Sequence, residues 1–398
     1  MVDSFIPQIR FKMCKNQWEK NKLSKLAKFN PKSTLPEKFK YVDLESVLGT
    51  DLISYREVSR ENAPSRAQRL AQKGDIFYQT VRPYQKNNYL FDSNEKDYVF
   101  STGYAQLRPL IDSAFLLARL QEESFVNMVL ERCTGTSYPA INSKDLSKIS
   151  VTIPQTIEEQ SAIGSLFRTL DDLLTSYKEN LVNYQSLKAT MLSKMFPKAG
   201  QTVPEIRLDG FEGEWEVVNL GTLIENYDEV ISGTSGFPIA TSSRKGLYLQ
   251  NDYFEGGRTG IDLTLDFHRV PIGYVTYRHM SDDSIFKFNK NNFETDVLVS
   301  KEYPVFISND SSDIDFLLYH LNNSRLFLRF STMQKLGGTR VRLYYKNLIT
   351  YKIAVPTVKE QQAIGTYFSN LDQLITSYQE KITQLETLKK KLLQNMFI

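Results

Sequence analysis

Residues 159–196 read EQSAIGSLFRTLDDLLTSYKENLVNYQSLKATMLSKMF, and residues 360–397 read EQQAIGTYFSNLDQLITSYQEKITQLETLKKKLLQNMF. The two stretches align without a gap at a constant offset of 201, and 18 of the 38 aligned positions are identical. A repeat of this strength indicates that the chain consists of two related halves, each ending in the same tail.

Apolar residues in both tails alternate in steps of four and three, which is the heptad pattern of a coiled coil. Each tail follows a strand that ends in proline, at Pro154 and Pro356, and proline disfavours continuation of a strand. A helix beginning near Ile157 and ending near Phe196 would be about 60 Å long at 1.5 Å per residue. The predicted seam residues are Ile163, Phe167, Leu170, Leu174, Tyr177, Leu181, Tyr184, Ile364, Phe368, Leu371, Ile375, Tyr378, Ile382 and Leu385.

The most economical arrangement packs the two seams on each other, and a two-fold relation between the halves would make that coiled coil antiparallel. The helices would then act as a spacer between two bodies, although a simple dimerisation helix explains the periodicity equally well. At one step both seams carry lysine, Lys188 and Lys389. Either these lysines set the register, or the adjacent Leu187 and Leu388 take over the packing.

A weaker match lies at the start of each half, at an offset of 197. It aligns Arg10 with Arg207 and the two tryptophans of the chain, Trp18 and Trp215, which predicts that each tryptophan fills an equivalent core site. Between the two matches, residues 24–134 and 224–336 show no alignment that we can defend. The resulting division is a first body at 1–155, a helix at 156–198, a second body at 199–357 and a helix at 358–398.

Both bodies contain short β-branched and aromatic runs bounded by turn residues, at 75–78, 246–249, 273–277 and 297–299. Helical periodicity is confined to 113–132 and 313–330. We therefore predict a mixed α/β fold with irregular, β-rich sheets in two tandem bodies.

Composition is that of a soluble globular protein, since 41% of the 398 residues are hydrophobic, 24% are charged, and no apolar run approaches the roughly 20 residues that span a bilayer. The N-terminus lacks the pattern of a signal peptide, which predicts a cytoplasmic protein. Motifs for nucleotide binding, amino-methyl transfer and metal ligation are absent, so we expect no catalysis and no cofactor bound by this chain.

Two segments place polar residues beside glycine or proline: residues 74–86 combine arginine, lysine, glutamine and tyrosine, and residues 335–342 combine arginine and lysine. Arginine and glutamine suit base edges, whereas lysine and tyrosine suit the DNA backbone. For each residue an ordinary surface role is the more frequent outcome. The candidates are Tyr78, Gln79, Thr80, Arg82, Tyr84, Lys86, Arg108, Arg244, Lys245, Arg258, Arg278, Lys335, Arg340 and Arg342.

The doubled Glu-Gln-x-x-Ile-Gly stretch at the start of a heptad helix resembles the conserved regions of the specificity (S, or HsdS) subunits of Type I restriction-modification systems. The pieces at 74–83 and 204–215 are also similar to parts of that family's target recognition domains. The first half departs from the pattern at 10–15, where the glycines of the second half are missing, which leaves the boundary of the first body less secure.

The resemblance implies that each body is a target recognition domain reading one half of a gapped double-stranded DNA site, and that the helices set the gap. It also implies two modification (methyltransferase) subunits as partners, which bring S-adenosylmethionine, and restriction (translocase/endonuclease) subunits, which bring ATP and Mg. The helices and the segments around Glu159-Gln160 and Glu360-Gln361 would be the docking surface for those subunits.

Two other classes of function remain as alternatives. A coiled-coil scaffold that never touches DNA would explain the seams but not the two bodies with arginine-containing loops. An enzyme acting on DNA by itself would need catalytic motifs that the sequence lacks.

Overall fold

A computed structural model describes residues 6–14, 16–135, 137–253, 262–335 and 340–397. The chain forms two compact units. Unit 1 comprises Met1–Asn180 with Tyr378–Ile398, and unit 2 comprises Leu181–Ser377. Each unit therefore combines one body with one end of each long helix.

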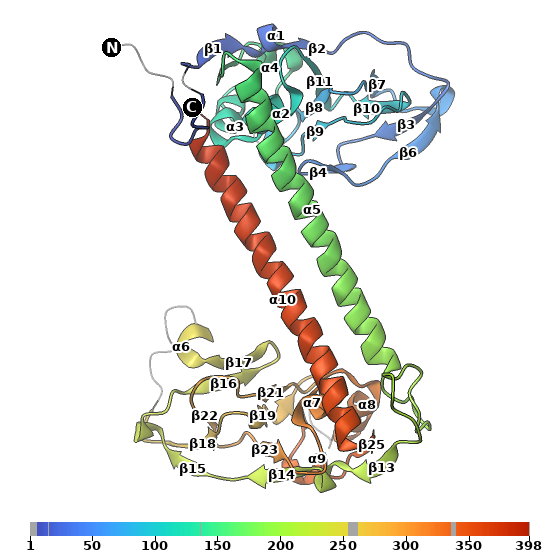
Figure 1. The fold of residues 1–398 in the computed structure, drawn as a ribbon, viewed down its shortest axis with the longest axis vertical. Coiled ribbons are helices and arrows are strands. Elements are labelled where there is room, and N and C mark those ends of the chain that lie inside the picture. Colours follow the sequence, from blue (N-terminus) through green and yellow to red (C-terminus); the bar gives the residue numbers. More distant parts are fainter. Residues whose placement is uncertain (1–5, 15, 136, 254–261, 336–339, 398) are drawn as a thin grey trace. The chain divides into compact units, whose positions relative to one another are not determined.

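Unit 1 is built mainly from short strands followed by helices (Figure 1). Its elements are β1 Glu19–Lys22, α1 Leu23–Leu26, β2 Ala27–Phe29, β3 Lys38–Val42, β4 Val47–Leu48, β5 Asp51–Leu52, β6 Arg56–Ser59, β7 Ala67–Leu70, β8 Ile76–Gln79, β9 Tyr89–Leu90, β10 Tyr98–Ser101, β11 Tyr104–Pro109, α2 Ser113–Gln121, α3 Glu123–Leu130, α4 Ser143–Ser147, β12 Ser150–Ile153 and the first part of α5 Ile157–Lys194.

Two four-stranded sheets form the body of unit 1, in the orders β6-β3-β10-β7 and β2-β11-β8-β9, and β1 pairs with β12. Strand β8 is buried on both faces, because alternate side chains of a strand point to opposite sides. Ile76 and Tyr78 belong to the core shared with α2 and α5, whereas Phe77 belongs to a second core that includes Phe100 and Tyr104.

Unit 2 also combines short strands with helices, but its sheet arrangement differs. They are β13 Glu216–Asn219, β14 Ile224–Tyr227, β15 Val230–Ser232, β16 Ala240–Ser243, β17 Gly246–Leu249, α6 Gln250–Tyr253, β18 Asp266–Val270, β19 Val275–Tyr277, β20 Met280–Ser281, β21 Phe288–Lys290, β22 Val297–Ser300, β23 Val305–Ser308, α7 Ile314–Asn323, α8 Arg325–Met333, β24 Val341–Arg342, α9 Tyr345–Leu348, β25 Lys352–Val355 and the first part of α10 Val358–Asn395. Its larger sheets have the orders β14-β23-β19-β21 and β15-β18-β22.

The predicted mixed α/β fold and the long helices are confirmed. The four predicted strand runs correspond to β8, β17, β19 and β22. The helices predicted at 113–132 and 313–330 are each two helices, which corrects the prediction. The breaks fall at Glu122 and Ser324, whose side chains accept hydrogen bonds from the first backbone N–H groups of α3 and α8 and so begin new helices there.

Helices α5 and α10 run antiparallel within unit 1 (Figure 1). Asp171 of α5 contacts Lys389 of α10, Lys178 contacts Glu386, and the Tyr177 and Tyr378 rings lie 5.3 Å apart. Residue numbers therefore rise along one helix as they fall along the other.

The end of each helix completes the core of the unit that it reaches. Phe397 packs against Trp18 in unit 1, and Phe196 packs against Trp215 in unit 2, with ring centroids 6.2 Å apart in both pairs. Both tryptophans are 2% exposed, as the repeat predicted.

The chain also meets each helix end with the same backbone hydrogen bond. Ile206 N donates to Lys194 O at 3.0 Å, where the chain runs directly from α5 into the second body. Ile9 N donates to Asn395 O at 2.9 Å, where the N-terminal segment lies against the end of α10.

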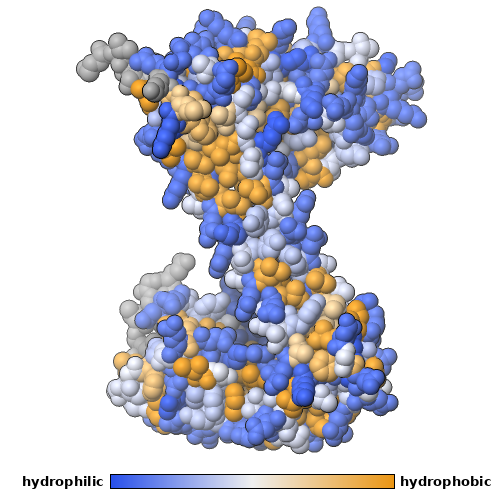
Figure 2. Space-filling view, viewed as in Figure 1, coloured by the Kyte–Doolittle hydropathy of each residue, from blue (hydrophilic) through white to orange (hydrophobic). Residues whose placement is uncertain are grey.

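Hydrophobic residues gather on the visible face of unit 1 near the helices, whereas hydrophilic and hydrophobic residues are interspersed over unit 2 (Figure 2). Within the described residues, no helix combines the length and the apolar character needed to cross a bilayer.

Candidate nucleic-acid interface

The Glu-Gln-x-x-Ile-Gly stretch of unit 1 holds the N-terminal segment against α5. Glu159 accepts hydrogen bonds from Arg10 Nε at 2.6 Å and from Arg10 Nη2 at 2.8 Å. Its Oε1 also accepts from Trp18 Nε1 at 3.1 Å. Hydrogen bonding to Glu159 raises the pKa of Arg10. These bonds tie Arg10 and Trp18, far away in the sequence, to the first turn of α5.

The same stretch also fastens α5 to the start of α2. Gln160 Oε1 accepts from the backbone N–H of Asp112 at 3.3 Å, and the Asp112 side chain caps α2 by accepting from Phe115 N at 2.8 Å. A Cβ added at Gly164 would lie 2.5 Å from Asp112 Oδ1 and 2.6 Å from Phe115 N. Only glycine permits so close an approach between the two helices.

Unit 2 repeats this arrangement, which we call the helix clamp. Glu360 accepts from Arg207 Nε and Nη2, both at 2.7 Å. Gln361 Oε1 accepts from Asp313 N at 3.0 Å, and a Cβ at Gly365 would lie 2.7 Å from Asp313 Oδ1.

The clamp buries the Glu and Gln side chains themselves, while neighbours such as Ile157 and Glu158 stay exposed. Glu159 and Gln160 are 2% and 4% exposed, and Glu360 and Gln361 are both 1% exposed. Their polar atoms are engaged within the chain, because a buried polar group that lacks a partner is unfavourable. The motif joins each body to its own helix.

The clamp reveals a repeat that the sequence comparison missed. Residues 112–120 read DSAFLLARL and residues 313–321 read DIDFLLYHL, with five identical positions at the same offset of 201 as the tails. The prediction that this region cannot be aligned is therefore wrong for α2 and α7. The signal is short, but extending the offset of the tails backwards would have found it.

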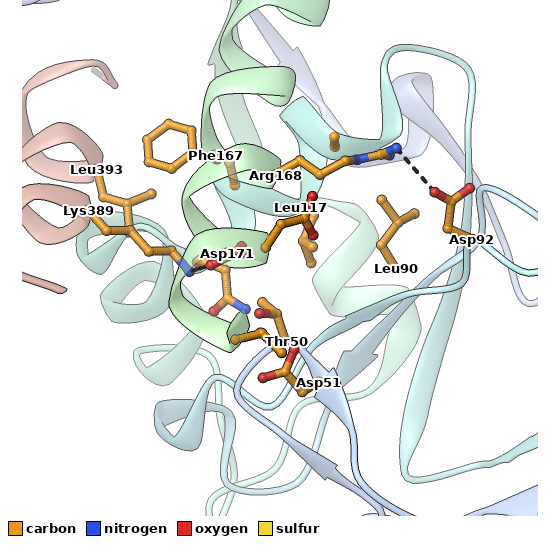
Figure 3. A pocket seen from close by; sticks show the side chains of 15 residues that line it. Thr50, Asp51, Leu90, Asp92, Leu117, Phe167, Arg168, Asp171, Lys389 and Leu393 are labelled. Atoms are coloured by element: carbon orange, nitrogen blue, oxygen red, sulfur yellow. Dashed lines mark hydrogen bonds and ion pairs between the residues drawn. The ribbon is translucent and has the colours of Figure 1, made fainter. Parts of the chain in front are cut away.

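The seam lysines lie in the helix interface and the neighbouring leucines do not. In unit 1 Lys389 reaches Asp171, beside Phe167 and Leu393 (Figure 3). In unit 2 Lys188 binds Asp372 in the same way. Lysine thus takes the seam position by pairing with an aspartate of the facing helix.

The leucines adjacent to these lysines face outward, with Leu187 41% and Leu388 46% exposed. The remaining predicted seam residues are all buried or half-buried. Those fully buried are Ile163, Phe167, Leu170, Leu174, Ile364, Phe368 and Leu371, and those half-buried are Tyr177, Leu181, Tyr184, Ile375, Tyr378, Ile382 and Leu385.

Three candidate DNA contacts in the first body are buried, which corrects their prediction. Tyr78 is 0%, Gln79 2% and Thr80 7% exposed, because β8 is covered on both faces. Burial raises the pKa of the Tyr78 phenol. Gln79 instead supports the following loop, since its Nε2 donates to Val81 O at 2.7 Å and to Gln85 Oε1 at 2.8 Å.

That loop presents Arg82 and Tyr84 at the surface. Arg82 has a left-handed backbone (φ 55°) and its N–H donates to Pro139 O at 2.8 Å, so the loop is fastened to a second segment. Its guanidinium carbon lies 4.3 Å from the ring centroid of Tyr138. Tyr138 is 62% and Tyr84 49% exposed. We call Arg82, Tyr84 and Tyr138 the unit 1 rim; Tyr138 was not predicted.

Two other candidates of the first body are engaged in ion pairs. Lys86 pairs with Glu123 at 2.5 Å. Arg108 donates two hydrogen bonds of 2.8 Å to the buried Asp75, and these bonds raise the pKa of Arg108. Their charge is therefore partly neutralised within the body.

In the second body, Arg244, Lys245 and Arg278 line one groove of about 560 Å³, which we call the unit 2 groove. Arg340 pairs with Asp282 on the groove wall at 2.9 Å. Arg342 is exposed on β24, which pairs with β20 beside the groove. The last two candidates fall elsewhere, because Lys335 is exposed after α8 and Arg258 lies outside the described residues.

Comparison with known proteins identifies the family. The sequence matches the model of the Type I restriction modification DNA specificity domain twice, at residues 15–184 and 237–387, and the chain belongs to this family. Membership suggests a non-catalytic role and does not favour the scaffold alternative.

Two curated relatives come from Methanocaldococcus jannaschii. The putative type I restriction enzyme MjaX specificity subunit is 23% identical over 303 residues, which cover 70% of this chain and 65% of that protein, slightly under two thirds. The type I restriction enzyme MjaVIII specificity subunit is 22% identical over 310 residues, covering 72% of this chain and 70% of that protein.

The fold is similar to a crystal structure of the Type-I restriction-modification system S subunit from M. genitalium. The TM-score is 0.60, with 14% identity and 99% of each chain covered. At this identity the likeness concerns the fold alone.

Proposed function

We propose that this chain is the DNA sequence-recognition subunit of a Type I restriction-modification complex. It binds a gapped two-part DNA target, with one half-site read by each body, and directs adenine methylation and restriction by its partner subunits. The chain itself carries no catalysis.

The observation that carries this proposal is the family match to each half separately, combined with two bodies that present different surfaces. The first body presents the unit 1 rim, in which the Arg82 guanidinium lies over the Tyr138 ring. The second presents the unit 2 groove, lined by arginine and lysine. Unlike bodies on a repeated scaffold suit two unlike half-sites, since basic residues that hold a body on the DNA backbone allow its other side chains to reach the base edges.

The segments 156–198 and 358–398 are proposed as the spacer between the two target recognition domains at 1–155 and 199–357. Support comes from the equal length of α5 and α10, 38 residues each, and from the clamp that fastens each body to a helix. Inserting seven residues into both helices should change the gap between half-sites without changing either half-site. An unchanged gap would exclude the spacer role.

We propose that two modification subunits, carrying S-adenosylmethionine, and restriction subunits, carrying ATP and Mg, assemble on this chain. The docking surface that we propose consists of the exposed residues around the Glu-Gln pairs and the outer face of the helices, where Leu187 and Leu388 are exposed at equivalent positions.

The proposal is tested by mapping methylated adenines with single-molecule sequencing, in cells that contain this chain with its modification subunit and in cells that lack the chain. A gapped two-part motif that appears only with the chain is expected. If the modification subunit is active and bound in a pull-down, but no motif depends on the chain, the proposal is wrong.

A further inference from the structure

The unit 2 groove has a clear boundary in the fold. It lies between the turn that joins β16 to β17, which carries Arg244 and Lys245, and the segment 280–287, which begins with β20. Tyr253 and Tyr303 complete its wall.

The acidic residues of the groove are already neutralised. Asp283 accepts hydrogen bonds from Arg244 Nη1 at 2.8 Å and from Nη2 at 2.5 Å. Asp282 pairs with Arg340. Because both carboxylates have a guanidinium partner, neither compensates the other cations of the groove.

Three cations remain. Among the residues that the structure describes, Lys245, Arg278 and Lys287 line the groove and form no ion pair with any carboxylate. Arg278 is exposed, and its charge also lowers the pKa of Tyr303, against the larger raising effect of burial. The groove therefore has an excess of positive charge that attracts an anion.

Lys287, which the sequence did not single out, is the most informative of the three. Its side chain is half-buried, and burial lowers the pKa of its ammonium, as does the charge of Lys188 nearby. Asp372 acts in the opposite direction, but Lys188 and Tyr319 already bind it. Withdrawing an ammonium from water without a counter-ion is unfavourable, and an anion in the groove would offset that cost.

We propose that the unit 2 groove binds a backbone phosphate of the DNA target through Lys287, Lys245 and Arg278. This inference rests on the proposed function and assigns the groove to backbone binding rather than to base reading. Lysine binds phosphate as a point charge, without the two-point geometry that arginine brings to guanine. Of the two arginines that line the groove, Arg244 and Arg278, Arg244 already uses both terminal nitrogens on Asp283.

The experiment compares Lys287→Met with Lys352→Met, a matched control whose lysine is exposed on β25 outside the groove. Each full chain is assembled with its modification subunits. The dissociation constant is measured by fluorescence anisotropy over a KCl series, for a duplex with the methylation target and for a scrambled duplex of equal length.

One lost phosphate contact reduces the slope of log Kd against log salt by about 0.9, which weakens binding about fivefold near 0.15 M salt. We expect this change in Lys287→Met for both duplexes, no change in Lys352→Met, and recovery of the slope in Lys287→Arg. The melting temperatures of all variants are compared, so that a folding defect in Lys287→Met is recognised. In that case Lys245→Met decides, because its lysine is exposed and lines the same groove: a slope lower than that of Lys352→Met supports the assignment, and an equal slope overturns it.

Equal slopes for Lys287→Met and Lys352→Met would overturn the assignment. A loss confined to the target duplex would also overturn it, because that result means base reading. If wild type binds both duplexes equally, the proposed function fails while the slope comparison still tests the groove. If wild type binds neither duplex, both proposals fail.

Discussion

Replacing Gly164 by alanine tests whether the Glu-Gln-x-x-Ile-Gly motif is an internal clamp. Alanine stabilises an unconstrained helix interior by about 1 kcal/mol relative to glycine. Here, however, the new Cβ would lie 2.5 Å from Asp112 Oδ1 and 2.6 Å from Phe115 N, and both atoms belong to the cap of α2.

The cost of this clash has two parts. Relieving it displaces α2, which costs about 1–3 kcal/mol as in other overpacked cores. It also disturbs the Asp112 cap, which is worth about 1 kcal/mol. After the gain in helix propensity is subtracted, Gly164→Ala should destabilise unit 1 by about 1–3 kcal/mol. For a unit of this size each kcal/mol lowers the melting temperature by about 2–4 °C.

The assay is scanning calorimetry of the full chain, with Ser165→Ala as the control. Ser165 is exposed on the same helix, so its replacement should leave the melting temperature unchanged or slightly raised. A Gly164→Ala chain that melts at or above the wild-type temperature would refute the clamp. If that chain also fails to assemble with modification subunits, the motif is a docking surface after all.

Burial lowers the pKa of His320 to about 4. Because an unfolded histidine has a pKa near 6.5, the unfolded chain takes up a proton first as the pH falls. The free energy of unfolding therefore keeps its full value above about pH 6.5 and is lower by about 3 kcal/mol at pH 4. The melting temperature of unit 2 should fall over this pH range in wild type and stay nearly constant in His320→Leu. An unchanged pH dependence in that variant would assign the effect to other groups. Tyr138→Ala should weaken DNA binding severalfold because Arg82 loses the ring on which it lies, a contact worth about 0.5–1 kcal/mol or more; Tyr138→Phe should retain binding, and equal binding by all three chains would exclude the stack. A chain cut at Gly200 and rejoined through its original termini should melt like wild type, because the same backbone hydrogen bond forms at both helix ends; aggregation or a lost transition would contradict this equivalence.

Local pattern and repetition in the sequence determined the long helices, the strand positions and the equivalent tryptophans. Each of these features depends on the periodicity of apolar residues or on the constant offset between the two halves. Both can be recognised in the sequence without knowing which distant residues are in contact. The family resemblance rested on the same repeat.

The tertiary structure alone decided which residues face outward. In the sequence Tyr78 and Gln79 resemble surface residues, because they precede the polar loop with Arg82. In the structure both faces of β8 are packed, so neither set of alternating side chains reaches the solvent. Lys188 and Lys389 occupy the seam because an aspartate on the other helix meets each of them. Burial and pairing of this kind depend on segments far apart in the chain, and no local pattern records them.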